Sequence, residues 1–145
     1  MNNPQGIQDL CDLLKEHSSK YVSKVQAVCA IKSRGFLFGP LIALQLQVPF
    51  IPIRKKGKLP GEVIELSFDM EYGSATLEIQ KNSIPPGSNV LIVDDLLATG
   101  STLEAGCMLI KNLGANVYHC VVIIELEEFN GKSKVPCPVH SFIKL

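Results

Sequence analysis

At 145 residues the chain is long enough for one domain, which would bury roughly 68–70% of the surface that its unfolded form exposes. Its 14 basic residues balance its 14 acidic residues, and this excludes the basic excess by which general nucleic-acid and membrane-surface binders attract phosphate. We see no signal peptide and no membrane span, and we expect a cytoplasmic protein. The cysteines are odd in number and widely spaced, which predicts reduced, mostly buried thiols rather than a disulfide framework or a zinc site. They are Cys11, Cys29, Cys107, Cys120 and Cys137.

The first elements alternate between helix and strand. Apolar residues recur at helical spacing over residues 7–17, and residues 25–31 (VQAVCAI) read as a short apolar strand. A polar turn at 32–35 follows, and then a helix over 36–47 with Pro40 in its first turn. This is a strand-to-helix crossover with polar residues at the carboxyl end of the strand.

The middle of the chain combines a proline-containing strand with a long excursion. Pro49 and Pro52 give the strand at 48–53 an irregular or edge character. The basic run RKKGK follows, which on the residues alone is best read as a solvated turn. Two antiparallel strands, at about 63–68 and 74–80, would then form an arm of the kind that serves as a lid or binding loop.

Residues 90–102 (VLIVDDLLATGST) form the most informative stretch. The β-branched run at 90–93 predicts a central parallel strand, with Asp94 and Asp95 at its carboxyl end, where open α/β sheets bind ligands. Paired acids could merely favour the dipole of the following helix, but together with the turn after them they suit a ribose phosphate. That turn offers backbone N–H groups and hydroxyls at a helix N-terminus. It consists of Ala98, Thr99, Gly100, Ser101 and Thr102. No Walker A loop and no G-x-G-x-x-G motif is present.

The remaining residues continue the alternation. A helix at 102–113 should end at Gly114, and a central strand at 117–126 should precede a charged loop at 129–134 and a final strand at 139–143. The sequence therefore predicts a single α/β domain with a twisted, mainly parallel sheet flanked by helices.

Residues 90–102 resemble the phosphoribosyl-pyrophosphate motif of type I phosphoribosyltransferases, and the wording DDLLATG is similar to that of adenine phosphoribosyltransferases. Four further segments resemble the same family in order: SRGFLFGP, IRKKGKLPG, EYGSATLEIQ and the strand end at Glu125 and Leu126. The resemblance implies the type I phosphoribosyltransferase fold with a flexible antiparallel lid arm. It also implies transfer of the phosphoribosyl group from phosphoribosyl pyrophosphate to adenine, giving AMP and pyrophosphate in purine salvage.

The resemblance further implies which residues would bind the phosphoribosyl group. Asp94 and Asp95 would hold the ribose hydroxyls and, indirectly, a Mg²⁺ ion that binds through the substrate without direct protein ligands. The turn from Ala98 to Thr102 would bind the 5-phosphate, and Arg34 would bind pyrophosphate. The basic loop, with Arg54, Lys55 and Lys58, would also reach pyrophosphate. Because it does so partly across a dimer interface in this family, a homodimer is expected.

Other matching residues would act on the base. Glu71 corresponds to the acidic residue of the mobile lid, and it would be catalytic by managing the proton of the purine imidazole nitrogen. Leu126 corresponds to a residue that packs on adenine. Tyr72 either caps the closed lid or is simply exposed.

The sequence departs from the family in three places. The family begins with a hood segment close to F-P-x-P-G-[IV]-x-F-x-D that selects adenine, and this sequence begins about where that segment ends. We therefore expect an incomplete base pocket. Lys32 stands where the family has an acid, and Ser101 replaces a second glycine. These departures leave two alternatives: a weakly active or inactive member that binds phosphoribosyl pyrophosphate or AMP in a regulatory or partner role, and the same chemistry on another 6-substituted purine.

Overall fold

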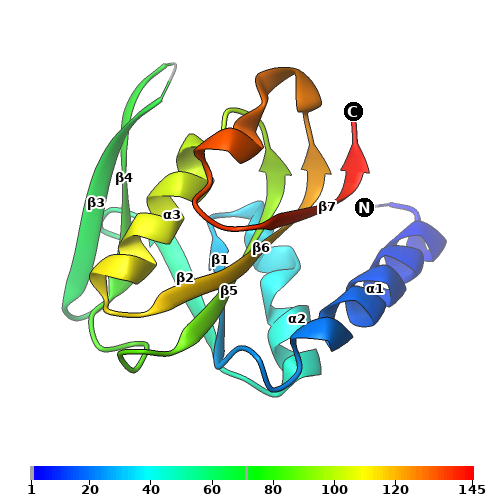
Figure 1. Ribbon diagram of the computed structural model, residues 1–145, viewed down its shortest axis with the longest axis horizontal. Helices are drawn as coiled ribbons and strands as arrows, with labels where there is room; N and C mark the ends of the chain where they lie inside the picture. The colour runs from blue at the N-terminus through cyan, green and yellow to red at the C-terminus, as the bar shows by residue number, and fades with distance from the viewer. Residues whose placement is uncertain (1, 71) are drawn as a thin grey trace.

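A mainly parallel sheet of seven strands lies between two layers of helix in the computed structural model, which describes residues 2–70 and 72–145 (Figure 1). The strands are β1 (Ala27–Ile31), β2 (Phe50–Lys55), β3 (Val63–Met70), β4 (Gly73–Gln80), β5 (Asn89–Leu97), β6 (Asn116–Glu125) and β7 (Val139–Lys144). They follow the order β3-β4-β2-β1-β5-β6-β7. From β2 to β7 neighbouring strands pair in parallel, whereas β4 and β3 pair antiparallel. The predicted fold class is confirmed.

The helices divide between the two faces of the sheet. They are α1 (Pro4–Ser18), α2 (Gly39–Leu46) and α3 (Ser101–Asn112), with short 3₁₀ turns η1 (Ser19–Tyr21), η2 (Arg34–Leu37), η3 (Glu127–Phe129) and η4 (Gly131–Lys134). Alternate residues of β5 feed two separate cores: Val90 and Ile92 pack with α3, and Leu91 and Val93 pack with α1 and α2. A strand buried on both faces must be apolar at every position. Each such side chain contributes about 1.5–3 kcal/mol through burial.

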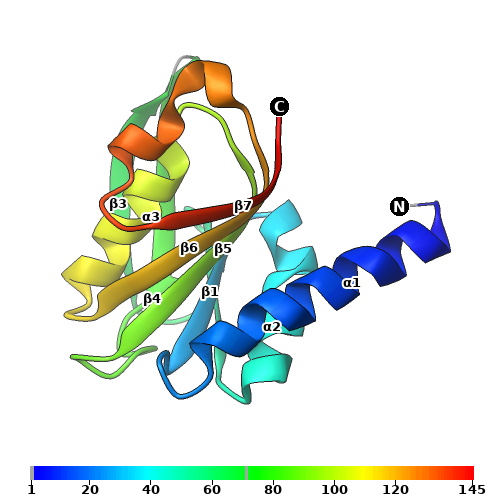
Figure 2. The same cartoon turned by 45° about the vertical axis from the view of Figure 1, so that its right-hand side comes forward.

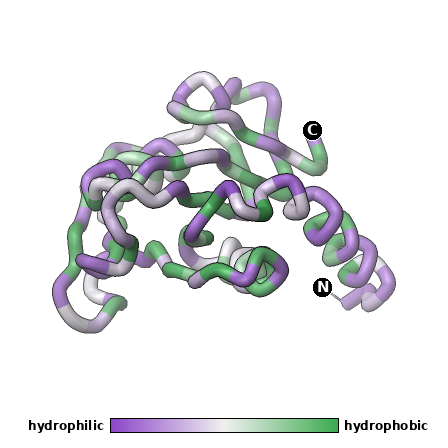
Figure 3. Tube along the Cα trace, turned by 60° about the horizontal axis from the view of Figure 1, so that its bottom comes forward, coloured by the Kyte–Doolittle hydropathy of each residue, from purple (hydrophilic) through white to green (hydrophobic). Residues whose placement is uncertain are grey.

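The first helix is amphipathic and packs with only one side. Asn3 caps its N-terminus by accepting a hydrogen bond from the Gly6 N–H across 3.1 Å, and Pro4 stands in the first turn. Leu14 is 2% exposed against the sheet layer. Hydrophilic and hydrophobic residues alternate along the coil of α1 (Figure 3), and its N-terminal end projects away from the sheet (Figure 2). No helix among the described residues combines the length and the apolar character needed to cross a membrane.

The predicted edge character of the strand at 48–53 needs correction. β2 lies inside the sheet, between β1 and β4. However, its pairing with β4 is confined to Arg54 and Lys55, whereas Phe50 to Ile53 pair only with β1. Pro52 therefore lies where one side of the strand has no ladder in the described structure, and its missing N–H removes no bond from that side.

Two further boundaries differ from expectation. β5 continues through Asp94 and Asp95 to Leu97, so the paired acids lie within the strand rather than after it. The strand extends because β6 pairs alongside it as far as Leu97 opposite Glu125. The predicted loop at 129–134 is largely 3₁₀ helix, at η3 and η4.

Candidate active site

A cavity of about 530 Å³ opens at the carboxyl edge of the sheet, where β1 and β5 end and α3 begins. Residues from five segments line it: Lys32, Ser33 and Arg34 after β1; Phe68, Met70, Tyr72, Ala75 and Leu77 from the arm; Asp94 to Gly100 of the central motif; Thr102 and Leu103 of α3; and Leu126 and Phe129 after β6. The structure thus brings many of the predicted site residues around one space, among them Arg34, Asp95 and Leu126. Their individual roles remain predictions.

The two adjacent aspartates occupy different environments. Asp94 is 6% exposed, and one of its carboxylate oxygens accepts a hydrogen bond from the Asp95 N–H across 2.8 Å. Burial raises the pKa of Asp94 well above its ordinary value, and the adjacent Asp95 charge acts in the same direction. The side chain of Asp95 is 23% exposed and faces the cavity. The pair therefore offers one buried carboxyl that favours its proton and one accessible carboxylate.

The loop after β1 packs tightly against the end of β5. Arg34 Nε lies 2.8 Å from Asp95 Oδ2, which pairs the guanidinium with the accessible carboxylate. A Cβ on Gly35 would lie 3.1 Å from the Val93 carbonyl oxygen and 3.4 Å from the Asp94 Cα, so the absence of a side chain permits this approach. The peptide bond between Lys32 and Ser33 is cis. The predicted pyrophosphate residue thus lies beside the predicted ribose residues.

The turn before α3 is shaped by two glycines that touch each other. Gly100 has φ of +90°, a conformation that favours glycine, and it precedes a helix whose first turn has no capping bond from a described side chain. A Cβ on Gly100 would collide with the carbonyl oxygen of Gly131, and a Cβ on Gly131 would collide with that of Ala98. No described side chain caps the first N–H groups of α3, so these groups are available to bind an anion.

Ser101 differs from its neighbours in the turn. Ala98, Thr99, Gly100 and Thr102 line the cavity, but among the described lining residues Ser101 is absent. Its hydroxyl instead accepts from Lys134 Nζ at 3.2 Å and from Thr99 Oγ1 at 3.4 Å.

The arm closes one side of the cavity. Phe68, Met70, Ala75 and Leu77 from β3 and β4 present apolar atoms to it, and Tyr72 lines it while remaining 95% exposed. Glu71, the predicted catalytic residue, lies outside the described residues. Leu126, which is predicted to pack on the base, and Phe129 add further apolar surface to the cavity.

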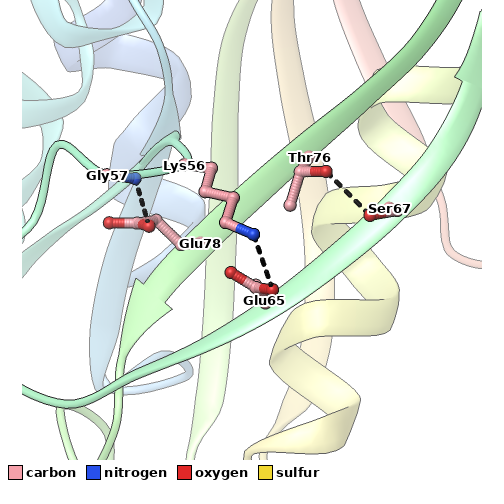
Figure 4. Close-up of polar contacts among 6 residues, drawn as sticks. All are labelled: Lys56, Gly57, Glu65, Ser67, Thr76 and Glu78. Carbon is pink, nitrogen blue, oxygen red and sulfur yellow. Dashed lines mark hydrogen bonds and ion pairs between the residues drawn. The ribbon is translucent and has the colours of Figure 1, made fainter.

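The basic loop lies apart from the cavity. Arg54, Lys55 and Lys58 are not among the described residues that line it. Arg54 instead places its guanidinium over the Phe36 ring, 5.9 Å from the ring centre. Glu78, which is 2% exposed, anchors the loop by accepting a hydrogen bond from the Gly57 N–H at 2.7 Å (Figure 4). It also accepts one from the Leu59 N–H at 2.8 Å. Two further bonds that brace the arm, Lys56 with Glu65 and Ser67 with Thr76, appear in the same view.

Several residues near the site were not predicted as functional. Phe129 belonged to a segment predicted as a loop. Lys134 and Gly131 reach the turn before α3 from 31 or more residues away in sequence. The one available signal was the G-K-S-K composition after β6, which resembles any solvated turn. Only the folding of η4 against residues 98–101 shows its relation to the site.

Comparison with known proteins shows the family of the chain. A model of the phosphoribosyl transferase domain matches residues 1–137. An adenine phosphoribosyltransferase of Caenorhabditis elegans is 49% identical over 134 residues, which cover 92% of this chain and 72% of that protein.

Solved structures of adenine phosphoribosyltransferases share the fold of the chain. The Saccharomyces cerevisiae adenine phosphoribosyltransferase, complexed with D-2,5-dideoxy-2,5-imino-altritol 1,6-bisphosphate and adenine, matches with a TM-score of 0.89 and 44% identity over 97% of this chain and 81% of that chain. The Trypanosoma brucei enzyme, in complex with AMP, pyrophosphate and ribose-5-phosphate, matches with a TM-score of 0.88 and 27% identity over 98% of this chain and 65% of that chain. From its sequence, its fold and these relatives, the chain belongs to the phosphoribosyl transferase family, among the adenine phosphoribosyltransferases.

Proposed function

We propose that this chain catalyses the transfer of a phosphoribosyl group from phosphoribosyl pyrophosphate to adenine, releasing AMP and pyrophosphate in purine salvage. The observation that carries the proposal is the single cavity that joins Asp94 and Asp95, the turn before α3, Arg34 and an apolar wall. These are the groups that a ribose, its 5-phosphate, a pyrophosphate and a purine need. The adenine, AMP, pyrophosphate and ribose-5-phosphate in the solved relatives support the same set of ligands.

The residues of this chain contribute to the reaction in three ways. Asp95 accepts hydrogen bonds from the ribose hydroxyls, and the buried Asp94 lies beside it on the wall of the same cavity. The guanidinium of Arg34 pairs with Asp95 through Nε and has further donors at its terminal nitrogens for the pyrophosphate. Charge that develops on the leaving group is thereby stabilised. The arm excludes water from the reacting carbon when it closes.

Mg²⁺ fits the donor set of the site. Paired carboxylates are hard oxygen ligands, and substrate hydroxyls and phosphates would complete the shell of an ion that dehydrates reluctantly. When bound, the ion would neutralise charge on the pyrophosphate. Asp94 and Asp95 would hold it indirectly, through the hydroxyls that they orient. The predicted homodimer, which would bring a second basic loop to the site, and the predicted cytoplasmic location complete the proposal.

Formation of AMP from labelled adenine and phosphoribosyl pyrophosphate, with Mg²⁺ present or chelated, tests the proposal. We expect Mg²⁺-dependent turnover that Asp95→Asn lowers by about 10²-fold or more in kcat/KM, and that Glu71→Ala slows strongly. Asp12→Asn is the control, because it makes the same chemical change on the exposed face of α1. There the Asp12 carboxylate accepts a hydrogen bond from Gln8 Nε2 at 3.0 Å, and the substitution should leave turnover unchanged.

Two results would contradict the proposal. A well-folded preparation that makes no nucleotide from adenine or any other purine would refute the activity. Full activity in Asp95→Asn would refute the role of the carboxylate. The comparisons give no support to the alternative of a non-catalytic regulatory member. Kinetics with other 6-substituted purines would decide whether adenine or another purine is the preferred substrate.

A further inference from the structure

Three cysteines that are far apart in sequence meet in the core on the α3 side of the sheet. Cys107 comes from α3, Cys120 from β6, and Cys137 from the segment that leads into β7, which runs beside β6 and α3 in both ribbon views (Figures 1 and 2). The Cys120 sulfur lies 3.4 Å from that of Cys137 and 3.9 Å from that of Cys107. All three sulfur atoms lie within 4.8 Å of one another. Helix, strand and loop thus present their thiols to one point.

The spacing suits a shared metal ion. Metal–thiolate bonds of about 2.3 Å place the sulfur atoms of a tetrahedral or trigonal site roughly 3.8–4.0 Å apart. Of the two short separations here, that of 3.9 Å lies within this range and that of 3.4 Å is somewhat shorter. Only small side-chain movements would bring all three sulfurs to bonding distance of one ion. A disulfide between Cys120 and Cys137 would instead use two sulfurs and give the third no role.

The donor set selects the kind of ion. Sulfur ligands favour soft ions and reject Mg²⁺ and Ca²⁺. Structural zinc sites have four ligands, and among the described residues this group contains three. Three thiolates in an apolar surrounding suit a soft monovalent ion of low coordination number.

We propose that Cys107, Cys120 and Cys137 form a three-coordinate thiolate site for a soft monovalent metal ion of the Cu(I) class, separate from the phosphoribosyl site. Each ligand sulfur donates a lone pair to the ion, and each thiol that is protonated beforehand releases its proton to solvent. The oxidation state of the metal does not change. The site rests on this cluster alone and not on the proposed transferase activity.

Access also favours the site. Cys107 is 3% exposed and Cys120 is fully buried, but Cys137 is partly exposed and lies between two exposed prolines, so an ion can enter from that side.

The test is anaerobic titration of the reduced full chain with Cu(I), in competition with a coloured Cu(I) chelator. We expect tight uptake of one ion per chain. Cys137→Ser and Cys120→Ala should each lower the affinity by more than the roughly 10–100-fold that loss of an outer-shell partner costs. Cys137→Ser is the decisive variant, because its position is partly exposed and its fold can be checked by circular dichroism.

Two matched controls use the remaining thiols. Cys11→Ser removes a partly exposed cysteine from α1, and Cys29→Ala removes a buried one from β1. Both should retain one tight ion per chain. Three results would overturn the site: no tight uptake by the wild-type chain, uptake that Cys137→Ser leaves unchanged, or uptake of Zn²⁺ in preference to Cu(I).

Discussion

Arg34 and Asp95 form an ion pair across the mouth of the candidate site, with 2.8 Å between Arg34 Nε and Asp95 Oδ2. The pair joins the loop after β1 to the carboxyl end of β5, two segments that are adjacent only because β1 and β5 pair in parallel. A residue predicted to bind pyrophosphate therefore neutralises a residue predicted to bind ribose. The two halves of the phosphoribosyl substrate would meet where these side chains touch.

Removing this guanidinium should impair activity much more than stability. Arg34→Gln should raise the KM for phosphoribosyl pyrophosphate and lower kcat/KM by about 10²-fold, because a donor to the leaving group is lost. The free energy of unfolding should change by less than about 1 kcal/mol, since the Arg34 side chain is 71% exposed. Arg34→Lys keeps the positive charge but loses the several N–H donors of the guanidinium. Its kcat/KM should fall between those of wild type and Arg34→Gln. Steady-state kinetics and urea unfolding measure both effects; equal kinetics for Arg34→Gln and wild type would refute the role.

The close contact between Gly131 and Ala98 should control the shape of the turn that is predicted to bind the 5-phosphate. Gly131→Ala would push against the Ala98 carbonyl oxygen, and overpacking of this kind costs about 1–3 kcal/mol. We expect a higher KM for phosphoribosyl pyrophosphate and a lower melting temperature, while the KM for adenine changes little. Gly6→Ala, in the first turn of the projecting helix, is the control and should alter neither constant. An unchanged KM in Gly131→Ala would show that the turn is positioned without this contact.

The hydrogen bonds that Glu78 accepts from the basic loop offer a second test of pyrophosphate binding. Glu78→Gln keeps the shape of the side chain but replaces one acceptor oxygen with an amide donor, which then faces the N–H of Gly57 or Leu59. A buried unsatisfied donor costs about 1–3 kcal/mol. The loop should therefore loosen and the KM for phosphoribosyl pyrophosphate should rise several-fold. Glu65→Gln, at the exposed ion pair with Lys56, should have a smaller effect. Equal effects of the two substitutions would contradict the anchor.

Stability should fall as the pH falls toward 4, because of a buried histidine. His17 stacks on His140 with 3.8 Å between ring centres, and its Nε2 lies 2.8 Å from the Tyr21 hydroxyl oxygen. Burial, followed by the His140 charge, lowers the pKa of His17 from 6.5 to about 4. Between these values the unfolded chain binds more protons than the folded chain, so the free energy of unfolding decreases as the pH is lowered.

Urea unfolding at pH 7 and pH 5 measures this effect. Wild type should lose about 1–2 kcal/mol over the interval once partial solvation of the ring is allowed for. His17→Gln, which cannot charge, should lose less, with the remainder due to groups such as His140, whose pKa is also lowered by burial. The same loss in both proteins would assign the pH dependence to other groups.

The sequence by itself determined the order of elements and the central chemistry. Local patterns suffice for this, because the apolar run at 90–93 specifies a strand buried on both faces. The residues from Asp94 to Thr102 follow it in one continuous stretch, so their spacing is visible in the sequence. The resemblance of this stretch to phosphoribosyltransferases was therefore readable without coordinates, and the relatives confirm it.

Only the tertiary structure decided which distant residues meet. Arg34 reaches Asp95, η4 reaches the phosphate-binding turn, and Cys107, Cys120 and Cys137 converge, although no spacing in the sequence indicates any of these contacts. The same is true of Pro52, which an internal strand accommodates because the ladder to β4 starts only at Arg54. Periodicity reports which face of an element is buried, whereas the register between strands sets what that face touches. Register depends on pairing across the whole sheet, and so it is fixed only when the chain folds.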